Sequence, residues 1–187
     1  MSLKQILSRH EPGDEPEAED LARIRAFVDL HPQPFDRAIA QGHLTASALV
    51  LTADGARVLL LFHAKLRRWL QPGGHAEPGE TQGEAIALRE ALEEHRPARP
   101  RAARSARRGR STWTSTTSPR ARRSPRTSTW TWRYLVVADP AAAIQPAEGE
   151  TTNVRWFAWD ELSGLDLDHG LRRALTKARY WCGRGGQ

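Results

Sequence analysis

A glycine-rich turn that runs directly into a helix is the feature that most constrains this chain. The stretch is GGHAEPGETQGEAIALREALEE, residues 73–94. At about 100° per residue, Glu90, Glu93 and Glu94 spread over roughly 100° of the helix surface. The other side is expected to be buried, and it carries four apolar residues: Ala85, Leu88, Ala91 and Leu92.

Three carboxylates on one part of a helix repel one another unless a cation lies between them. Oxygen ligands of this kind suit Mg²⁺ or Mn²⁺, which keep some waters and bridge to substrate phosphates. A helix rich in Ala, Leu, Glu and Arg is also typical of a plain solvated surface. The preceding loop favours a metal site, because glycines allow close approach of the backbone to a ligand and acids add oxygen donors: Gly73, Gly74, Gly79, Glu77 and Glu80.

The same stretch resembles the Nudix box, G-x5-E-x7-R-E-U-x-E-E-x-G-U with U aliphatic, of the Nudix hydrolases. Ala91 stands at the first U, and six residues match the fixed positions: Gly74, Glu80, Arg89, Glu90, Glu93 and Glu94. There are two departures. Eight residues rather than seven separate Glu80 from Arg89, and His95-Arg96-Pro97 replaces the x-Gly-aliphatic ending, whose glycine would cap the helix.

The resemblance extends over roughly residues 43–94 and 133–180. It includes HLTASALVL, RVLLLFHAKLRRWLQPGGH, RYLVVADP and VRWFAWDEL, which read like the strands and flanks of a Nudix domain. It implies an α+β fold, an αβα sandwich with a mixed β-sheet and the box helix against one face. We therefore expect an N-terminal helical extension over 1–42, a single Nudix-like domain over 43–180 and a tail over 181–187.

The resemblance also implies a reaction, the Mg²⁺-dependent (or Mn²⁺-dependent) hydrolysis of a diphosphate linkage in a nucleoside diphosphate derivative. Glu93 and Glu94 are then the metal ligands, with the Gly74 carbonyl, and Glu90 is a further ligand or a base near the attacking water. Arg89 lies four residues before Glu93 and is expected to hold that carboxylate. An ordinary surface pair worth a few tenths of a kcal/mol is the alternative interpretation.

Weaker candidates surround this set. Glu80 is expected to stabilise the loop, and Glu77 is an outer-shell candidate. Trp69 is a candidate for stacking on a base, with packing as its alternative, and Lys65 for contacting phosphates, with an ordinary surface turn as its alternative. The resemblance also implies a further site glutamate from a later loop, for which Glu148 or Glu150 is the candidate, with a solvated loop acid as the alternative interpretation of each.

Residues 95–132 contain 11 arginines and no acid, and without them the rest of the chain carries a net charge of about −5. The segment lacks Ile, Leu, Val, Met and Phe, so its composition predicts disorder. One interpretation is an arm that binds single-stranded nucleic acid by charge and stacking. We favour a frameshifted segment, because codons for His95-Arg96-Pro97 can encode Thr-Gly-Leu, the missing end of the box, when they are read one base later; resequencing the gene tests this. The segment is expected to impair folding next to the site.

At 187 residues the chain suits one soluble domain with a sizeable core. It has no run of 18 apolar residues, we expect no secretory signal from the look of its first residues, and Cys182 is its only cysteine. We expect a cytoplasmic protein with a small-molecule nucleotide substrate, no membrane partner, nucleic acid as an unlikely ligand and a homodimer as a candidate state. A Nudix-like module that binds a nucleotide without cleaving it is the alternative function.

Hydrophobic spacing indicates the remaining elements. Leu21, Ile24, Phe27 and Val28 predict a helix that Pro32 and Pro34 end, after an acidic linker over 14–20. Residues 46–63 predict a hairpin around Asp54-Gly55, and residues 135–137 and 154–159 predict strands. Asp168 is expected to cap a last helix whose buried face carries Leu171, Leu175 and Ala178.

Overall fold

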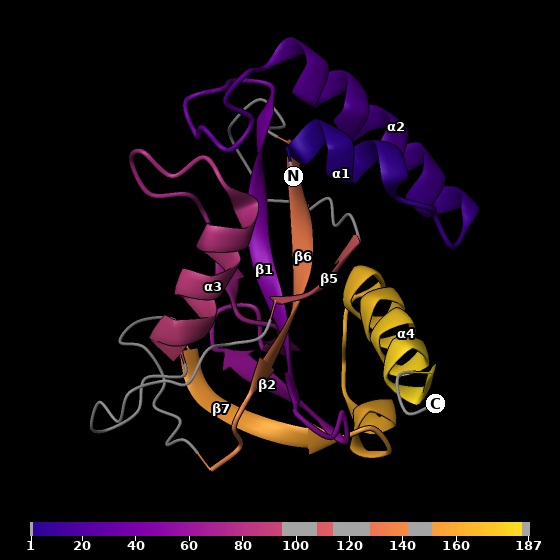
Figure 1. The fold of residues 1–187 in the computed structure, drawn as a ribbon. Helices are drawn as coiled ribbons and strands as arrows, with labels where there is room; N and C mark the ends of the chain where they lie inside the picture. The colour runs from indigo at the N-terminus through magenta and orange to yellow at the C-terminus, as the bar shows by residue number, and fades with distance from the viewer. Residues whose placement is uncertain (1, 95–107, 114–127, 142–150, 185–187) are drawn as a thin grey trace.

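The structure is a computed structural model that describes residues 2–94, 108–113, 128–141 and 151–184. A mixed sheet lies between helices (Figure 1). Its seven strands are β1 (Gly42–Thr52), β2 (Arg57–His63), β3 (Arg68–Leu70), β4 (Gly73–Gly74), β5 (Arg108–Trp113), β6 (Ser128–Ala138) and β7 (Thr151–Ala158). The helices are α1 (Leu3–Arg9), α2 (Glu15–Leu30), α3 (Gly83–Glu94) and α4 (His169–Arg184), with a 3₁₀ turn at Glu161–Gly164. The predicted α+β class and αβα sandwich are confirmed.

The strand order is β3-β2-β1-β6-β5, with β4 also paired to β1 and β7 to β2. Only β1 and β6 run parallel among the described pairs; the other pairs are antiparallel. β1 is buried over its whole length because it lies in the middle of the sheet with a layer on each face. The predicted hairpin is confirmed, since β1 and β2 flank a turn in which Gly55 has φ +67°.

Two apolar cores lie on opposite faces of β1. Its even-numbered residues pack with α2 and α3, and this core contains Leu44, Ala46, Ala48, Val50, Ile86, Ala87, Ile24 and Phe27. Its odd-numbered residues Leu49 and Leu51 pack with α4 through Leu171, Ala174 and Leu175. α3 and α4 therefore cover opposite faces of the sheet, while α1 and α2 lie across one end of it (Figure 1).

The predicted last helix is confirmed in its cap and its face. The amide of Leu171 donates to a carboxylate oxygen of Asp168 at 2.8 Å, and Leu171, Leu175 and Ala178 are buried. No helix in the described part of the chain has the length and apolarity needed to span a membrane.

The prediction of disorder over 95–132 is wrong for its last residues. β6 begins at Ser128, seven residues before the predicted strand, and pairs with β1 from its first residue. Trp130 and Trp132 alternate along β6 and are 8% and 0% exposed. Their indole rings form the apolar face of this part of β6, which contains no aliphatic residue. Residues 108–113 form β5, and the rest of the segment lies outside the described residues, as do the predicted loop glutamates Glu148 and Glu150 and the end of the tail.

The predicted acidic linker over 14–20 is also wrong, because Asp14 caps α2 and residues 15–20 are its first turns. The amide of Glu17 donates to the Asp14 carboxylate at 2.8 Å, and Glu15 and Glu17 suit the positive end of the helix dipole. The predicted apolar face of this helix is confirmed, with all four of its residues buried: Leu21, Ile24, Phe27 and Val28.

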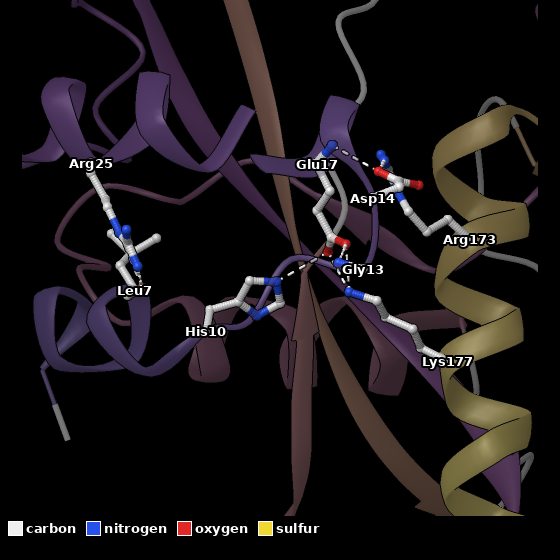
Figure 2. Close-up of polar contacts among 8 residues, drawn as sticks. All are labelled: Leu7, His10, Gly13, Asp14, Glu17, Arg25, Arg173 and Lys177. Atoms are coloured by element: carbon white, nitrogen blue, oxygen red, sulfur yellow. Dashed lines mark hydrogen bonds and ion pairs between the residues drawn. The ribbon is translucent and has the colours of Figure 1, made fainter. Parts of the chain in front are cut away.

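Glu17 is fully buried and joins the N-terminal helices to α4 (Figure 2). Lys177 donates to both of its carboxylate oxygens at 2.6 Å, His10 contacts one of them at 3.0 Å, and the Gly13 amide donates at 2.6 Å. Beside it, Arg173 of α4 donates to Asp14 at 2.6 Å. A buried charge needs such partners, so this cluster fastens α1 and α2 to the rest of the fold.

Acid should weaken this attachment. Burial raises the pKa of Glu17, but hydrogen bonds from His10, Lys177 and Gly13 and the charge of Lys177 outweigh it and lower the pKa from 4.5 to about 2. A carboxyl group whose pKa is lower in the folded than in the unfolded protein adds stability at pH values above its unfolded pKa. For Glu17 this contribution is lost as the pH falls from 4.5 towards 2. Urea unfolding at pH 6 and pH 3 should show a smaller loss of stability in Glu17→Gln than in the wild type; equal losses would contradict this.

Candidate active site

The box helix α3 packs on the sheet through Ile86, Ala87 and Ala91, which are 0%, 0% and 4% exposed. The predicted apolar face is therefore mostly wrong. Ala85 is exposed, Leu88 is half-buried and Leu92 is 51% exposed. The reason is that Glu90 lies within the buried stripe, between Ile86 and Ala87 on the helical wheel, so the helix is rotated to turn this carboxylate towards the sheet.

Glu90 lies against Gly74 of β4. β4 is held in place by pairing with β1, where Gly74 stands opposite Ala46. A Cβ on Gly74 would lie 2.7 Å from the carboxylate carbon of Glu90, well inside contact distance. Only glycine lets this carboxylate reach the strand backbone, which explains why the box begins with a glycine at position 74.

Arg89 binds the acids of the box. Its Nε and Nη2 donate to the two oxygens of Glu80 at 3.0 and 3.1 Å. Its Nη1 lies 3.1 Å from a carboxylate oxygen of Glu90 and 3.2 Å from one of Glu93, and 4.0 Å from Glu77. These charges raise the pKa of Arg89, with the Glu80 hydrogen bond the largest cause. We call Arg89, Glu80, Glu90 and Glu93 the box cluster.

Glu80 connects the loop to the helix. Besides binding Arg89, its carboxylate accepts from the Glu77 amide at 2.8 Å, and Arg89 also donates to the backbone oxygen of His75 at 2.9 Å. The Arg89 hydrogen bond is the first cause of the lowered pKa of Glu80. Two residues, Thr81 and Gln82, separate Glu80 from α3, which begins at Gly83.

The other sequence-predicted residues are more scattered. Trp69 packs edge-on against Phe62 and Phe157, with ring centroids 5.4 and 4.7 Å away, as its packing alternative requires. Lys65 is exposed in the turn after β2, and Glu94 is the last residue of α3, with its side chain outside the described part. Among the described residues, no three Asp, Glu, His or Cys side chains are arranged as a complete metal site.

Two features near the box are absent from the sequence predictions. His43 is 8% exposed, its ring lies 5.0 Å from that of His75, and neither ring nitrogen has a hydrogen-bond partner among the described residues. Residues 32–37, between α2 and β1, line a groove with residues 76–81 of the box loop. No local sequence pattern predicts either feature, because both depend on contacts between segments that lie far apart in the sequence.

Replacing Gly74 by alanine should reduce activity by on the order of tenfold or more, because the added Cβ displaces Glu90 and misplaced site carboxylates cost this much. Steady-state hydrolysis is the measurement. Gly164→Ala is the matched control, since nothing lies within 4 Å of a Cβ there. Equal activity of the two variants would contradict this role of Gly74.

Comparison with known proteins places the chain in a family. The model of the NUDIX domain matches residues 42–178. None of the curated proteins compared with the chain matches it. The solved structures similar to it share its fold at low sequence identity.

One is the NUDIX domain of Shewanella oneidensis NrtR complexed with ADP ribose, with a TM-score of 0.57 and 17% identity over 96% of this chain and 98% of that chain. A C. elegans Ap4A hydrolase has a TM-score of 0.53 and 17% identity over 77% of this chain and 98% of that chain. A bifunctional NMN adenylyltransferase/ADP ribose pyrophosphatase from Francisella tularensis, complexed with AMP and a Mn ion, has a TM-score of 0.56 and 17% identity over 96% of this chain and 59% of that chain. With the family model spanning most of its length, the chain belongs to the NUDIX domain family, the family of Nudix-type pyrophosphohydrolases.

Proposed function

We propose that this protein is a Mg²⁺-dependent hydrolase that cleaves the diphosphate linkage of a nucleoside diphosphate derivative. The observation that carries the proposal is the box cluster, in which Arg89 holds Glu80, Glu90 and Glu93 together beside Gly74. Solved relatives with ADP ribose, or with AMP and a Mn ion, support a nucleotide substrate and a divalent metal.

The donor set fits a hard dication. Glu90 and Glu93 present carboxylate oxygens from one side of α3, and the glycine of β4 lets the Glu90 carboxylate approach the strand backbone, where a Cβ would clash with it. We propose that Glu93 and Glu94 hold the metal together with the Gly74 carbonyl, all of them oxygen donors of the kind Mg²⁺ and Mn²⁺ prefer, and that Glu90 is a further ligand or the base beside it. A bound dication neutralises phosphate charge and lowers the pKa of a water that attacks phosphorus.

The protein's own groups have separate tasks. One nitrogen of Arg89 donates to Glu93 and forms an ion pair with Glu90 at 3.1 Å, so the guanidinium fixes the positions of the two carboxylates relative to each other. Glu90 is the group we assign to take the proton of the attacking water, because it is the least exposed acid of the cluster, at 17%. Glu80 is a positioning residue, since it acts through Arg89 and the loop amide of Glu77.

A substrate panel tests the proposal. The purified chain is incubated with Mg²⁺ and, separately, nucleoside triphosphates, nucleotide sugars, ADP ribose, dinucleoside polyphosphates and coenzyme A. Products are quantified by chromatography. We expect turnover of at least one compound, its loss with EDTA and its return with Mg²⁺ or Mn²⁺.

Absence of turnover over the whole panel, in this chain and in a frame-repaired version, would leave the non-catalytic nucleotide-binding module as the better function. Binding of ADP ribose without turnover would favour that module directly. Cytoplasmic location, pairing into a homodimer and the division at residues 42 and 180 stay predictions.

A further inference from the structure

A groove of about 520 Å³ lies between the box loop and the segment that joins α2 to β1. Its volume falls within the usual range for small-molecule sites, about 300–1,000 Å³. The two walls are residues 32–37 and residues 76–81, which lie side by side beyond one end of β1 (Figure 1). The first wall belongs to the N-terminal extension, which the sequence did not connect with the site.

The groove adjoins the box cluster. Glu77 and Glu80 line it, and both contact Arg89, at 4.0 and 3.0 Å, while Arg89 contacts Glu90 and Glu93. A substrate whose diphosphate lies at the box carboxylates therefore has the groove beside it for one of its two ends.

The charges of the groove exclude a second phosphate as its occupant. The lining carries three acids, Asp36, Glu77 and Glu80, against one cation, Arg37. Arg89 compensates Glu80, and the Asp36 carboxylate accepts from the Ala38 amide at 2.8 Å. A phosphate would still face uncompensated negative charge, whereas hydroxyl groups and amines donate hydrogen bonds to carboxylates.

Arg37 is the group on this wall that is free to bind a ligand. Its side chain is exposed, and it makes no hydrogen bond or ion pair within the part of the chain that the structure describes. A guanidinium donates hydrogen bonds to ribose oxygens and base acceptors and stacks on a base. The rings of Pro32 and Pro78 add apolar surface to the same groove.

The wall that presents Arg37 is rigidly held. Phe35 is 3% exposed in the core, and the Pro34 carbonyl accepts from the Leu44 amide at 2.7 Å. α2, which precedes the wall, is fastened to α4 through Glu17 and Lys177 (Figure 2). A preorganised wall loses little entropy when a ligand binds.

We propose that this groove binds the nucleoside end of the substrate and that Arg37 is a binding residue within it. The N-terminal extension is then part of the substrate site. This inference rests on the proposed function, because it uses the diphosphate position at the box cluster.

Arg37→Ala tests the inference on whichever panel compound has the highest kcat/KM. We expect KM to rise about tenfold, the effect of losing a hydrogen bond from a charged group, with kcat within about twofold of the wild type. Arg37→Lys should recover only part of the loss, because an ammonium lacks the planar fork. Arg23→Ala is the matched control, an exposed arginine of the same extension that pairs with Glu19.

An unchanged KM in Arg37→Ala, or a fall in kcat alone, overturns the inference. Should the wild type hydrolyse nothing, the proposed function fails by itself, and the groove is judged by equilibrium binding of ADP ribose. There, the wild type should bind about tenfold more tightly than Arg37→Ala; equal binding, or none, overturns the inference.

Discussion

Glu93→Gln should lower kcat by about 10²–10³-fold, because it removes a charged oxygen from the proposed metal site, and metal ions contribute several kcal/mol to the transition state. Arg89 loses one of its carboxylate partners in this variant but keeps Glu80 and Glu90. The fold should therefore persist. Steady-state kinetics with saturating Mg²⁺ on the best panel substrate is the measurement.

Glu84→Gln is the control, since it makes the same change of charge in the first turn of the same helix on an exposed side chain. It should keep wild-type kcat. Undiminished turnover in Glu93→Gln would remove the enzymatic interpretation of the box cluster. A Mn²⁺ titration followed by electron paramagnetic resonance should show weaker binding in Glu93→Gln than in Glu84→Gln.

Lys177→Met should destabilise the protein by about 3 kcal/mol, because it leaves the fully buried carboxylate of Glu17 without the ammonium that donates to both of its oxygens. His10 and the Gly13 amide remain, so the loss stays at the low end for a broken buried pair. For a chain of this size the melting temperature should fall by roughly 6–12 °C. Differential scanning calorimetry at pH 7 measures it.

The same substitution at Lys4 is the matched control. Lys4 pairs with Asp29 on the surface, with side chains 61% and 67% exposed, and such pairs contribute little. Adding Glu17→Gln to Lys177→Met should recover part of the stability, because the buried charge is gone. Equal melting temperatures of Lys4→Met and Lys177→Met would show that the Glu17 cluster does not fasten the helices.

Periodicity and turn chemistry predicted much of the fold. The apolar spacing of α2, the Asp54-Gly55 turn and the Asp168 cap are local signals, and the structure confirms each. The burial of Trp130 and Trp132 is harder to predict, because the surrounding arginines and serines do not continue the apolar alternation of the two tryptophans. Burial of both rings depends on the partner strand β1, which no window of the sequence around them contains.

The site was predicted in its residues and only partly in its geometry. The contacts of Arg89 with Glu93 follow from four-residue spacing in a helix. Its contacts with Glu80 do not, since Glu80 lies in the loop before α3 begins at Gly83, and helical spacing does not fix the path of that loop. The position of the Glu90 side chain towards the sheet depends on Gly74 of β4. The groove depends on where the N-terminal extension returns to the sheet.

The guanidinium of Arg89 gives the carboxylates of α3 a permanent internal counter-ion. Repulsion among these acids is therefore relieved without a dication, and we expect folding not to depend on metal occupancy as it does in small zinc domains. A chelator should abolish the proposed Mg²⁺-dependent turnover and leave the circular dichroism spectrum unchanged. Inactivation and unfolding should then be separable, and reloading with Mg²⁺ should need no refolding step.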